Sequence, residues 1–217
     1  MKSKKQSPSG WNLYLVLDRG PDVDDRSLMK KVTGALRGGV AAVQLRDKGR
    51  DAVDSIPFAR SVRRVCRERR VPFLVNDRIE VALAVDADGL HVGRADIPPA
   101  LARAMLGDSK IVGVSASSID GVRKAERSGA DYAGIGPVFA TPFKKGATPV
   151  RRHDLAKAAG LAFPVFAIGG IDVRGARALA SFGMKRAAVI RSVLGSRSPR
   201  RSAARLIGIL KGGHDTT

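Results

Sequence analysis

Residues 111–135, IVGVSASSIDGVRKAERSGADYAGI, decide the fold, because two apolar runs stand on either side of a segment with helical spacing. The runs at 111–114 and 132–135 do not alternate with polar residues, which is typical of strands covered on both faces. Between them, apolar residues of the segment 122–127 recur at the spacing of a helix. The stretch therefore predicts a strand, a crossover helix and a second, parallel strand.

The same unit recurs along the whole chain. The predicted strands are residues 13–17, 41–45, 72–75, 89–92, 111–114, 132–135, 164–168 and 186–190. Helical segments follow them at residues 28–36, 60–70, 81–84, 100–106, 122–127, 155–159, 176–182 and 203–210. Eight such units predict a single (β/α)₈ TIM barrel, because eight parallel strands close into a barrel.

A doubly wound open sheet fits the same alternation. Dinucleotide-binding proteins of that class carry GxGxxG after the first strand, whereas residues 18–21 read DRGP. The phosphate-loop pattern GxxxxGK[ST] is absent as well. No glycine-rich linker or change of composition divides the chain, so we predict one barrel at 12–211, a flexible basic N-terminus at 1–11 and a polar tail at 212–217.

The chain carries a large excess of positive charge. Its 217 residues include 39 Lys and Arg against 20 Asp and Glu, a formal net charge of +19. These basic residues gather at the N-terminus, in the helix predicted at 60–70 and at 197–205, where they form either a solvated surface or a surface for an anionic partner. Aromatic residues make up only 5% and are not interleaved with the basic runs, so we do not expect nucleic acid to be that partner.

A single cysteine, Cys66, rules out a disulfide within the chain. No apolar run approaches the roughly 18 residues of a membrane span, and the run at 13–17 is too short for a secretory signal. We therefore expect a soluble protein in the reducing cytoplasm, without membrane association.

In a barrel of this kind the active site is built at the carboxyl ends of the strands. Strand two ends in Gln44, Arg46 and Lys48, which the alternation of a strand places on one side. Gln44 is polar within an otherwise apolar strand and needs a hydrogen-bond partner if it faces inward. The other interpretation makes Arg46 and Lys48 ordinary surface charges.

Strands three and four end near Asn76, Asp77, His91 and Asp96. Two carboxylates at the mouths of neighbouring strands can hold Mg²⁺, which keeps several waters and takes phosphate oxygens. The other interpretation makes Asp77 and Asp96 helix caps or loop residues, which is the commoner role of isolated aspartates. A lone histidine such as His91 is more often a hydrogen-bonded core residue than a ligand or base, and the three histidines lack the spacing of a zinc motif.

Strand five delivers Ser115, and the long loop after strand six carries Thr141, Lys144 and Lys145. A loop with two lysines is suited to close over an anion, although solvated lysines are common in loops. We predict that this loop takes part in the site.

Gly169 and Gly170 end strand seven, directly before a helix. Glycines allow backbone N–H groups to approach an anion at a helix N-terminus. Strand eight ends in Arg191 and Ser192, and barrels often bind phosphate between the loops after strands seven and eight. These four residues therefore form a predicted phosphate site.

Several motifs together resemble the superfamily of thiamine-phosphate synthases and thiazole tautomerases. They are LYLV at 13–16, QLRDK at 44–48, NDR at 76–78, ADGLHVG at 87–93, GVS at 113–115, GPVFATP at 136–142 and AIGGI at 167–171. The match extends over almost the whole chain in family order, although each motif alone is weak.

The resemblance implies an enzyme of thiamine biosynthesis. Such a transferase moves the aminopyrimidine methyl group of 4-amino-2-methyl-5-(diphosphooxymethyl)pyrimidine to a thiazole phosphate and releases pyrophosphate, by a dissociative reaction assisted by Mg²⁺. Its partners are then two phosphorylated small molecules. The sequence leaves the oligomeric state open, and a homo-oligomer is one option.

The resemblance also implies a role for each matching residue. Those assigned to catalysis are Arg46, Lys48, Ser115 and Lys144; those assigned to substrate binding are Gln44, Asn76, Thr141, Gly169, Gly170, Arg191 and Ser192; those assigned to Mg²⁺ are Asp77 and Asp96. Within these sets, Gln44, Arg46, Lys48 and Asn76 hold the pyrophosphate, Ser115 lies beside the pyrimidine, and Thr141, Gly169 and Gly170 contact the thiazole phosphate.

The chain departs from the family pattern at a few positions. Arg94 and Ala95 stand where Gln and Glu are usual, Ser117 replaces a histidine, Phe143 a threonine and Arg191 a serine. Tautomerase relatives tend to carry a histidine where this chain has a proline at position 137. Two alternatives to the synthase function are a divergent family member such as a tautomerase-like isomerase, and a barrel that binds a polyanion without catalysis.

Overall fold

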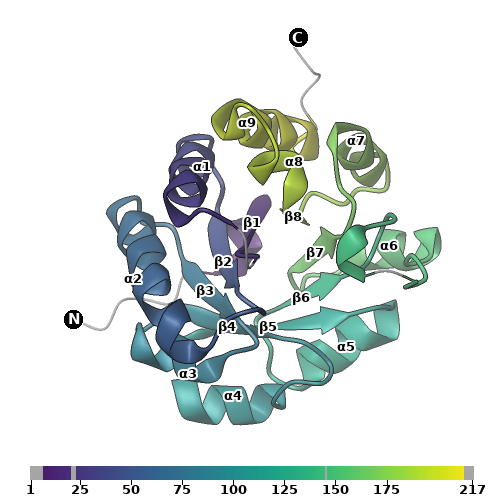
Figure 1. Cartoon of the computed structure of the whole chain (residues 1–217). Helices are drawn as coiled ribbons and strands as arrows, with labels where there is room; N and C mark the ends of the chain where they lie inside the picture. The colour runs from purple at the N-terminus through teal and green to yellow at the C-terminus, as the bar shows by residue number, and fades with distance from the viewer. Residues whose placement is uncertain (1–6, 21–22, 145, 213–217) are drawn as a thin grey trace.

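The computed structural model describes residues 7–20, 23–144 and 146–212, and these residues form a closed barrel of eight parallel strands paired in chain order (Figure 1). The strands are β1 Leu13–Asp18, β2 Ala42–Arg46, β3 Phe73–Asn76, β4 Gly89–Val92, β5 Ile111–Ala116, β6 Tyr132–Ile135, β7 Val165–Ile168 and β8 Ala187–Val189. The α-helices are α1 Asp25–Arg37, α2 Ala52–Glu68, α3 Ile79–Ala84, α4 Pro99–Leu106, α5 Ile119–Arg127, α6 Arg152–Ala159, α7 Val173–Ser181, α8 Arg191–Leu194 and α9 Pro199–Leu210. The predicted TIM barrel is confirmed, and the open sheet is excluded.

Helix α5 shows how the sequence forms the outer layer. The Ser118 side chain accepts a hydrogen bond from the Gly121 N–H and thereby caps the first turn. One face of the helix carries Ile119, Val122 and Ala125, which are buried against the strands. Burial of such an aliphatic side chain contributes about 1.5–3 kcal/mol, so the amphipathic pattern fixes which face meets the barrel.

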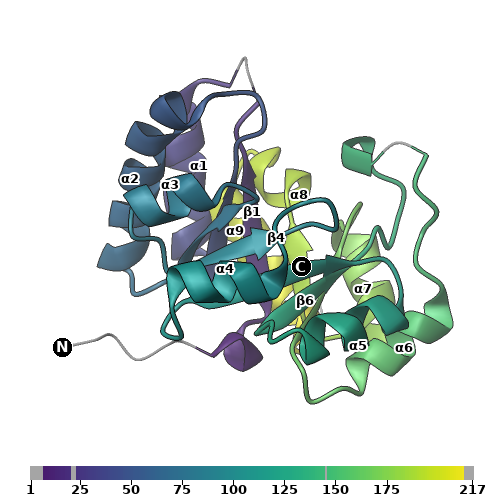
Figure 2. The same cartoon turned by 90° about the horizontal axis from the view of Figure 1, so that it is seen from below.

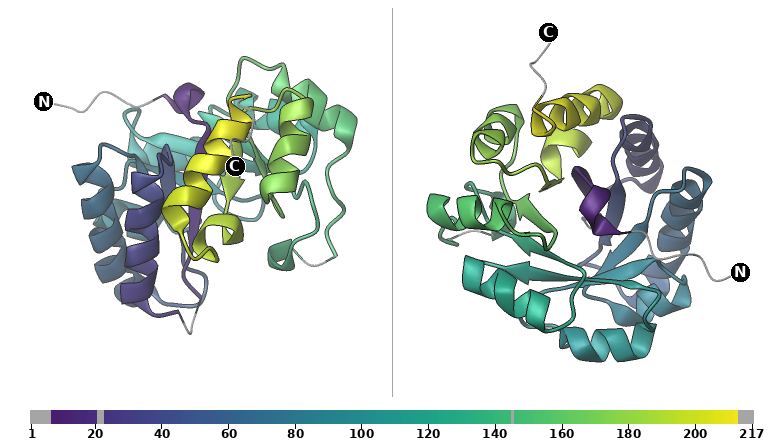
Figure 3. Two further views of the ribbon diagram at one scale, coloured as in Figure 1. Left: turned by 90° about the horizontal axis from the view of Figure 1, so that it is seen from above. Right: turned by 180° about the vertical axis from the view of Figure 1, so that it is seen from behind.

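An aromatic layer fills the amino-terminal end of the barrel. The rings of Trp11, Tyr14, Tyr132 and Phe166 pack edge to face or tilted, with centroids 5.4–6.0 Å apart. The short 3₁₀-helix η1, Pro8–Gly10, lies across this end in the view from behind (Figure 3). The interior is therefore packed at this end and opens at the carboxyl ends of the strands.

The N-terminal segment is more ordered than its sequence predicts. Residues 1–6 of the predicted flexible segment 1–11 lie outside the described residues, but Trp11 is only 5% exposed. The packed part of the chain thus begins before residue 12. The Trp11 ring packs on the aromatic layer, and burial of its large apolar surface holds this segment in place. Residues 213–217 of the predicted tail lie outside the described residues.

Three strands end one residue later than the apolar runs predict. Asp18 pairs with Arg46 across β1 and β2, and Asn76 pairs with His91 across β3 and β4. Ladder pairing depends on backbone groups, so it continues into polar residues whose side chains reach the open end of the barrel. Strand β8 is shorter than predicted because the chain turns at Ile190 into helix α8.

None of the helices in the described ranges is long and apolar enough to cross a membrane. The only cysteine of the sequence, Cys66, is buried in the layer between strands and helices, and burial raises the pKa of its thiol to about 12.

Part of the excess positive charge lines a shallow groove beside α2. The groove is formed by Arg60, Arg63, Arg64, Arg67, Ala84, Val85 and Asp86. Arg63 pairs with Asp86 at 2.6 Å, so the groove includes an acidic group as well as basic ones. Solvation of this helix face and binding of an anionic partner both stay predictions.

Candidate active site

A cavity of about 1460 Å³ occupies the carboxyl ends of the strands. The predicted site residues whose side chains the structure describes all line it: Gln44, Arg46, Lys48, Asn76, Asp77, Asp96, Ser115, Thr141, Gly169, Gly170, Arg191 and Ser192. The remaining one, Lys144, ends the 3₁₀-helix η2, Pro142–Lys144, in the loop after β6. Figure 2 shows this loop standing out at the end of the barrel opposite η1. The fold thus gathers residues from distant parts of the sequence at one rim.

The end of β2 carries two cations into the cavity. Arg46 pairs with Asp18 of β1, and its guanidinium lies 5.6 Å from the centre of the Phe143 ring in η2. Lys48 Nζ lies 2.9 Å from an oxygen of Asp77. These partners hold both cations at the rim, where they remain partly exposed to an incoming anion.

Asp77 and Asp96 form a pair of neighbouring carboxylates. The backbone of Asp77 has φ +63°, a left-handed conformation that is uncommon outside glycine and that here follows strand β3 directly. Asp96 accepts a hydrogen bond of 2.6 Å from the Gly93 N–H. Burial, and then its hydrogen bond with Asp77, raise the pKa of Asp96 above the usual value. Neither aspartate caps a helix, because the N-cap positions of α3 and α4 are Arg78 and Pro98, neither of which makes a side-chain cap hydrogen bond.

The donor set of this carboxylate pair suits a hard cation. Within the described ranges, no group of three or more His, Cys, Asp or Glu side chains could hold a metal ion. Two carboxylates match Mg²⁺, which retains waters and takes its other ligands from substrate phosphates. Two close carboxylates, one with a raised pKa, also favour a positive charge between them.

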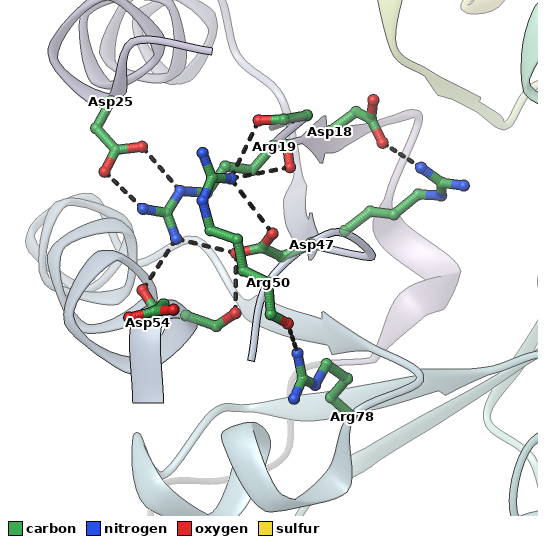
Figure 4. Close-up of polar contacts among 10 residues, drawn as sticks. Asp18, Arg19, Asp25, Asp47, Arg50, Asp54 and Arg78 are labelled. Carbon is green, nitrogen blue, oxygen red and sulfur yellow. Dashed lines mark hydrogen bonds and ion pairs between the residues drawn. The ribbon is translucent and has the colours of Figure 1, made fainter. Parts of the chain in front are cut away.

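Behind the rim lies a buried group of charges around Arg19 (Figure 4). Arg19 donates two hydrogen bonds to Asp25, at 2.7 and 2.8 Å, and one of 2.9 Å to Asp47. Its guanidinium also lies 4.4 Å from the centre of the Phe58 ring. Burial alone lowers the pKa of Arg19, but the hydrogen bonds to both aspartates outweigh it, so the pKa is raised. This group is a structural ion-pair network.

The network connects the loops after β1, β2 and β3. Ser55 donates a hydrogen bond of 2.9 Å to Asp47, and Arg50 donates to the backbone carbonyls of Arg19 and Gly20. Arg78 in turn donates to the carbonyl of Arg50 (Figure 4). Because Asp47 stands between Arg46 and Lys48 in the sequence, these bonds fix the segment that presents both cations.

A chain of side-chain hydrogen bonds runs through the barrel interior, and all of its residues line the cavity. Gln44 donates from Nε2 to the hydroxyl of Tyr14, whose oxygen lies 2.8 Å from that of Tyr132. His91 bonds to Tyr132 through Nδ1 at 3.0 Å and to Ser115 through Nε2 at 2.9 Å. Sequence reasoning found Gln44 and Ser115 but not the two tyrosines, whose signal was a polar hydroxyl within an otherwise aliphatic strand.

Gly113 leaves the space that Tyr132 occupies. A Cβ atom at Gly113 would overlap the outer ring atoms of Tyr132. The Tyr132 ring is fully buried and packs against Trp11 and Phe166, so it has no room to move aside.

The turn after β7 requires its glycines. Gly169 and Gly170 both have left-handed backbones, with φ +104° and +66°. A Cβ at Gly169 would lie 2.8 Å from Pro137, and one at Gly170 would lie 2.5 Å from the carbonyl oxygen of Ala140. The turn leads into α7, which Asp172 caps by accepting from the Gly175 N–H at 2.8 Å.

Helix α8 begins at Arg191, directly after β8, which is the strand next to β7, and both Arg191 and Ser192 line the cavity. Among the ion pairs of the described residues none involves Arg191, so a pairing with Asp172 is not seen. The Oγ atom of Ser192 is buried and has no hydrogen-bond partner within the described part of the chain. A buried hydroxyl without a partner at a cavity wall is suited to a polar ligand atom.

Known proteins match both the sequence and this geometry. The family described as "Thiamine monophosphate synthase" matches residues 13–193. The chain belongs to the thiamine monophosphate synthase family.

Two relatives and one solved structure illustrate the match. Thiamine-phosphate synthase of Methanobrevibacter smithii is 38% identical over 90% of this chain and 93% of that protein. The enzyme of the same name from Syntrophomonas wolfei is 40% identical over 91% of this chain and 95% of that protein. The structure of thiamine phosphate pyrophosphorylase from Pyrococcus furiosus has a TM-score of 0.82 and 32% identity, and covers 94% of this chain and 98% of that chain.

The positions at which the chain departs from the pattern of the thiamine monophosphate synthase family lie around the cavity. Arg94, Ala95, Ser117, Phe143 and Arg191 all line it. The departures therefore alter the surface that meets the substrates and not the packing of the barrel.

Further lining residues come from α5 and α6. They include Asp120, Arg123, His153, Asp154 and Lys157. His153 Nε2 lies 3.0 Å from Asp154. No sequence signal singles these residues out, since they lie within helices whose polar residues read as solvated.

Proposed function

We propose that the chain acts as a thiamine-phosphate synthase. It would join an aminopyrimidine methyl diphosphate to a thiazole phosphate and release pyrophosphate. The observation that carries this proposal is the convergence of the matching family residues on one cavity at the carboxyl ends of the strands, in a chain that belongs to this family.

The cations at the end of β2 support a role in holding the departing pyrophosphate. Arg46 can offer two parallel donors to phosphate oxygens, and Lys48 a compact charge beside them. Gln44 and Asn76 line the same wall and can donate from their amide groups. Catalysis here is electrostatic: the residues stabilise the negative charge that develops on the leaving group.

The carboxylate pair supports the binding of Mg²⁺. Asp77 and Asp96 would hold the ion, which supplies positive charge against the diphosphate. Lys48, which now pairs with Asp77 at 2.9 Å, would be released toward the phosphate oxygens when a cation takes its place. We assign Lys144 to the same anion because the resemblance to the family implies a catalytic role for it.

The opposite wall supports binding of the thiazole phosphate. Gly169 and Gly170 expose backbone at the turn before α7, and Thr141 lies on the loop beside them. Arg191 can add a bidentate contact that a serine cannot make, and the unpartnered hydroxyl of Ser192 offers a further one. The two substrates would thus meet in the middle of the cavity, above Ser115.

The experiment is a direct assay. Purified protein is incubated with both phosphorylated substrates and Mg²⁺, and thiamine phosphate and pyrophosphate are measured by chromatography. Stoichiometric release of both products supports the proposal. Turnover of a thiazole phosphate alone would favour a tautomerase-like isomerase, and the absence of turnover together with salt-sensitive binding of a polyanion would favour a non-catalytic barrel. The cytoplasmic location and the homo-oligomer stay predictions.

A further inference from the structure

The hydrogen-bond chain in the barrel interior joins Gln44 to Ser115 through three side chains that are almost entirely buried, and all five residues line the cavity. Tyr14 and Tyr132 are 2% and 0% exposed, and His91 is 7% exposed. Burial raises the pKa of both tyrosines above the usual value, so both hydroxyls keep their protons at neutral pH. The number of protons in the hydrogen-bond chain is therefore fixed, and each proton can be assigned to one donor atom in turn.

The placement starts at Gln44, whose Nε2 can donate but cannot accept. The oxygen of Tyr14 accepts this bond, so the single hydroxyl proton of Tyr14 turns to its other partner, the oxygen of Tyr132. Tyr132 accepts from Tyr14, and its own proton turns to Nδ1 of His91.

The same counting fixes the other half of the chain. His91 accepts at Nδ1, so its ring proton resides on Nε2, which lies 2.9 Å from the Ser115 hydroxyl. Ser115 accepts from Nε2, and its hydroxyl proton is left to point into the cavity. A chain with this polarity makes Ser115 a donor to whatever occupies the cavity.

We propose that Tyr132 and His91 are positioning residues that hold the Ser115 hydroxyl as a hydrogen-bond donor to the substrate, because Gln44 and Tyr14 leave the Tyr132 proton no acceptor other than His91. This inference rests on the proposed function. A ring nitrogen of an aminopyrimidine is a hydrogen-bond acceptor, whereas its exocyclic amino group is a donor. A Ser115 that only donates therefore favours the orientation that brings a ring nitrogen to it, and disfavours the one that brings the amino group.

The tautomer of His91 is the direct test. The chain has three histidines, and ¹⁵N NMR of the imidazole rings distinguishes a proton on Nε2 from one on Nδ1. Signals are assigned by comparison with His153→Gln and His214→Gln variants. We expect His91 in the Nε2–H form at neutral pH, in the full chain without substrate. The Nδ1–H form, or an imidazolium, would overturn the proposal.

Two matched variants separate positioning from packing. Tyr132→Phe and Tyr14→Phe each remove one buried hydroxyl from the same aromatic layer. In Tyr132→Phe the donor to Nδ1 is lost, so we expect a mixture of tautomers and a KM for the pyrimidine diphosphate that is about three- to tenfold higher, with the KM of the thiazole phosphate unchanged. In Tyr14→Phe the proton of Tyr132 still has His91 as its acceptor, so the Nε2–H form should persist.

A purely structural role of the hydroxyls predicts another pattern. Both variants would then lose thermal stability to a similar extent, and the His91 tautomer would be the same in each as in the parent protein. That pattern overturns the proposal. Where Tyr132→Phe fails to fold, the tautomer in the parent protein and in Tyr14→Phe still decides.

The failure of this inference is distinct from the failure of the proposed function. The NMR measurement needs no turnover, so an inactive protein with His91 in the Nε2–H form refutes the synthase activity and leaves the polarised chain standing. An active protein with His91 in the Nδ1–H form does the reverse.

Discussion

Two groups of charged side chains share the loops after β1 and β2, and they differ in how their charges are paired. In the buried group, the guanidinium of Arg19 bonds to two aspartates and a carbonyl and lies against an aromatic ring. In the rim group, Arg46 and Lys48 each have one carboxylate partner and remain partly exposed. The first group does not line the cavity, whereas Arg46 and Lys48 of the second group do.

The difference shows that alternate residues of one short motif belong to different groups. In QLRDK, residues 44–48, alternate side chains lead to opposite sides of the strand end. Gln44, Arg46 and Lys48 line the cavity, while Asp47 is buried beside Arg19. Substitutions in the rim group should therefore change activity, and substitutions in the buried group should change stability.

The largest effect is expected for Asp77→Asn. Removing one of two carboxylates weakens the proposed Mg²⁺ site, whose charge stabilisation is worth several kcal/mol, so kcat/KM should fall by roughly a thousandfold. Asparagine tolerates the left-handed backbone of position 77, so the Tm should remain close to that of the parent protein. Initial rates across a Mg²⁺ titration test this, and normal turnover would show that Asp77 does not hold the ion.

The next effect is on stability, in Asp47→Ala. The substitution leaves part of the buried charge of Arg19 without its partner, and breaking such a pair costs about 3–5 kcal/mol. Because Asp25 still pairs with Arg19, we expect a loss near 3 kcal/mol, measured by urea unfolding. Asp54, which is exposed in the first turn of α2, is the matched control, and Asp54→Ala should cost less than about 1 kcal/mol. Equal losses would contradict the division into two groups.

A smaller effect is expected for Arg46→Ala. One charge-assisted hydrogen-bonding group is worth about 1.5–3 kcal/mol, so kcat/KM should fall by roughly ten- to a few hundredfold. The ion pair of Arg46 with Asp18 is partly exposed, and stability should change by about 1 kcal/mol or less. Arg46→Lys keeps the positive charge but loses the two parallel N–H donors of the guanidinium. If kcat/KM of Arg46→Lys equals that of the parent protein, only the charge of residue 46 matters.

The smallest effect is expected for Arg191→Ser, which restores the usual family residue. Loss of one phosphate contact should raise the KM of the thiazole phosphate by about tenfold and leave that of the pyrimidine diphosphate nearly unchanged. Steady-state kinetics with each substrate varied in turn measures both values. An unchanged KM for the thiazole phosphate would remove Arg191 from the site.

The sequence predicted the barrel because its signal is repeated: each strand is a short apolar run and each is followed by a helical segment. It also predicted the rim residues, since every residue after a parallel strand reaches the same end of the barrel. The alternation at Gln44, Arg46 and Lys48 was sufficient to place all three in the cavity.

The sequence could not predict contacts that depend on three-dimensional packing. The bonds of Arg19 to Asp25 and Asp47 join loops whose relative position only the closed barrel defines. Tyr14 and Tyr132 read as strand residues, and their shared hydrogen bond spans 118 positions of the chain. Trp11 was assigned to a flexible segment for the same reason. Its neighbours in the sequence do not show that it packs against Tyr132 and Phe166, which lie far away in the chain.

Gly113 gives the hydrogen-bonded interior a low tolerance to mutation. A change from glycine to alanine needs one nucleotide and adds one methyl group, yet that methyl group would occupy the volume of the Tyr132 ring. Gly113 has no side chain, so it makes none of the side-chain hydrogen bonds itself. Selection for the orientation of the Ser115 hydroxyl would therefore also keep a glycine at position 113. Gly113 contributes only by leaving room for the Tyr132 ring.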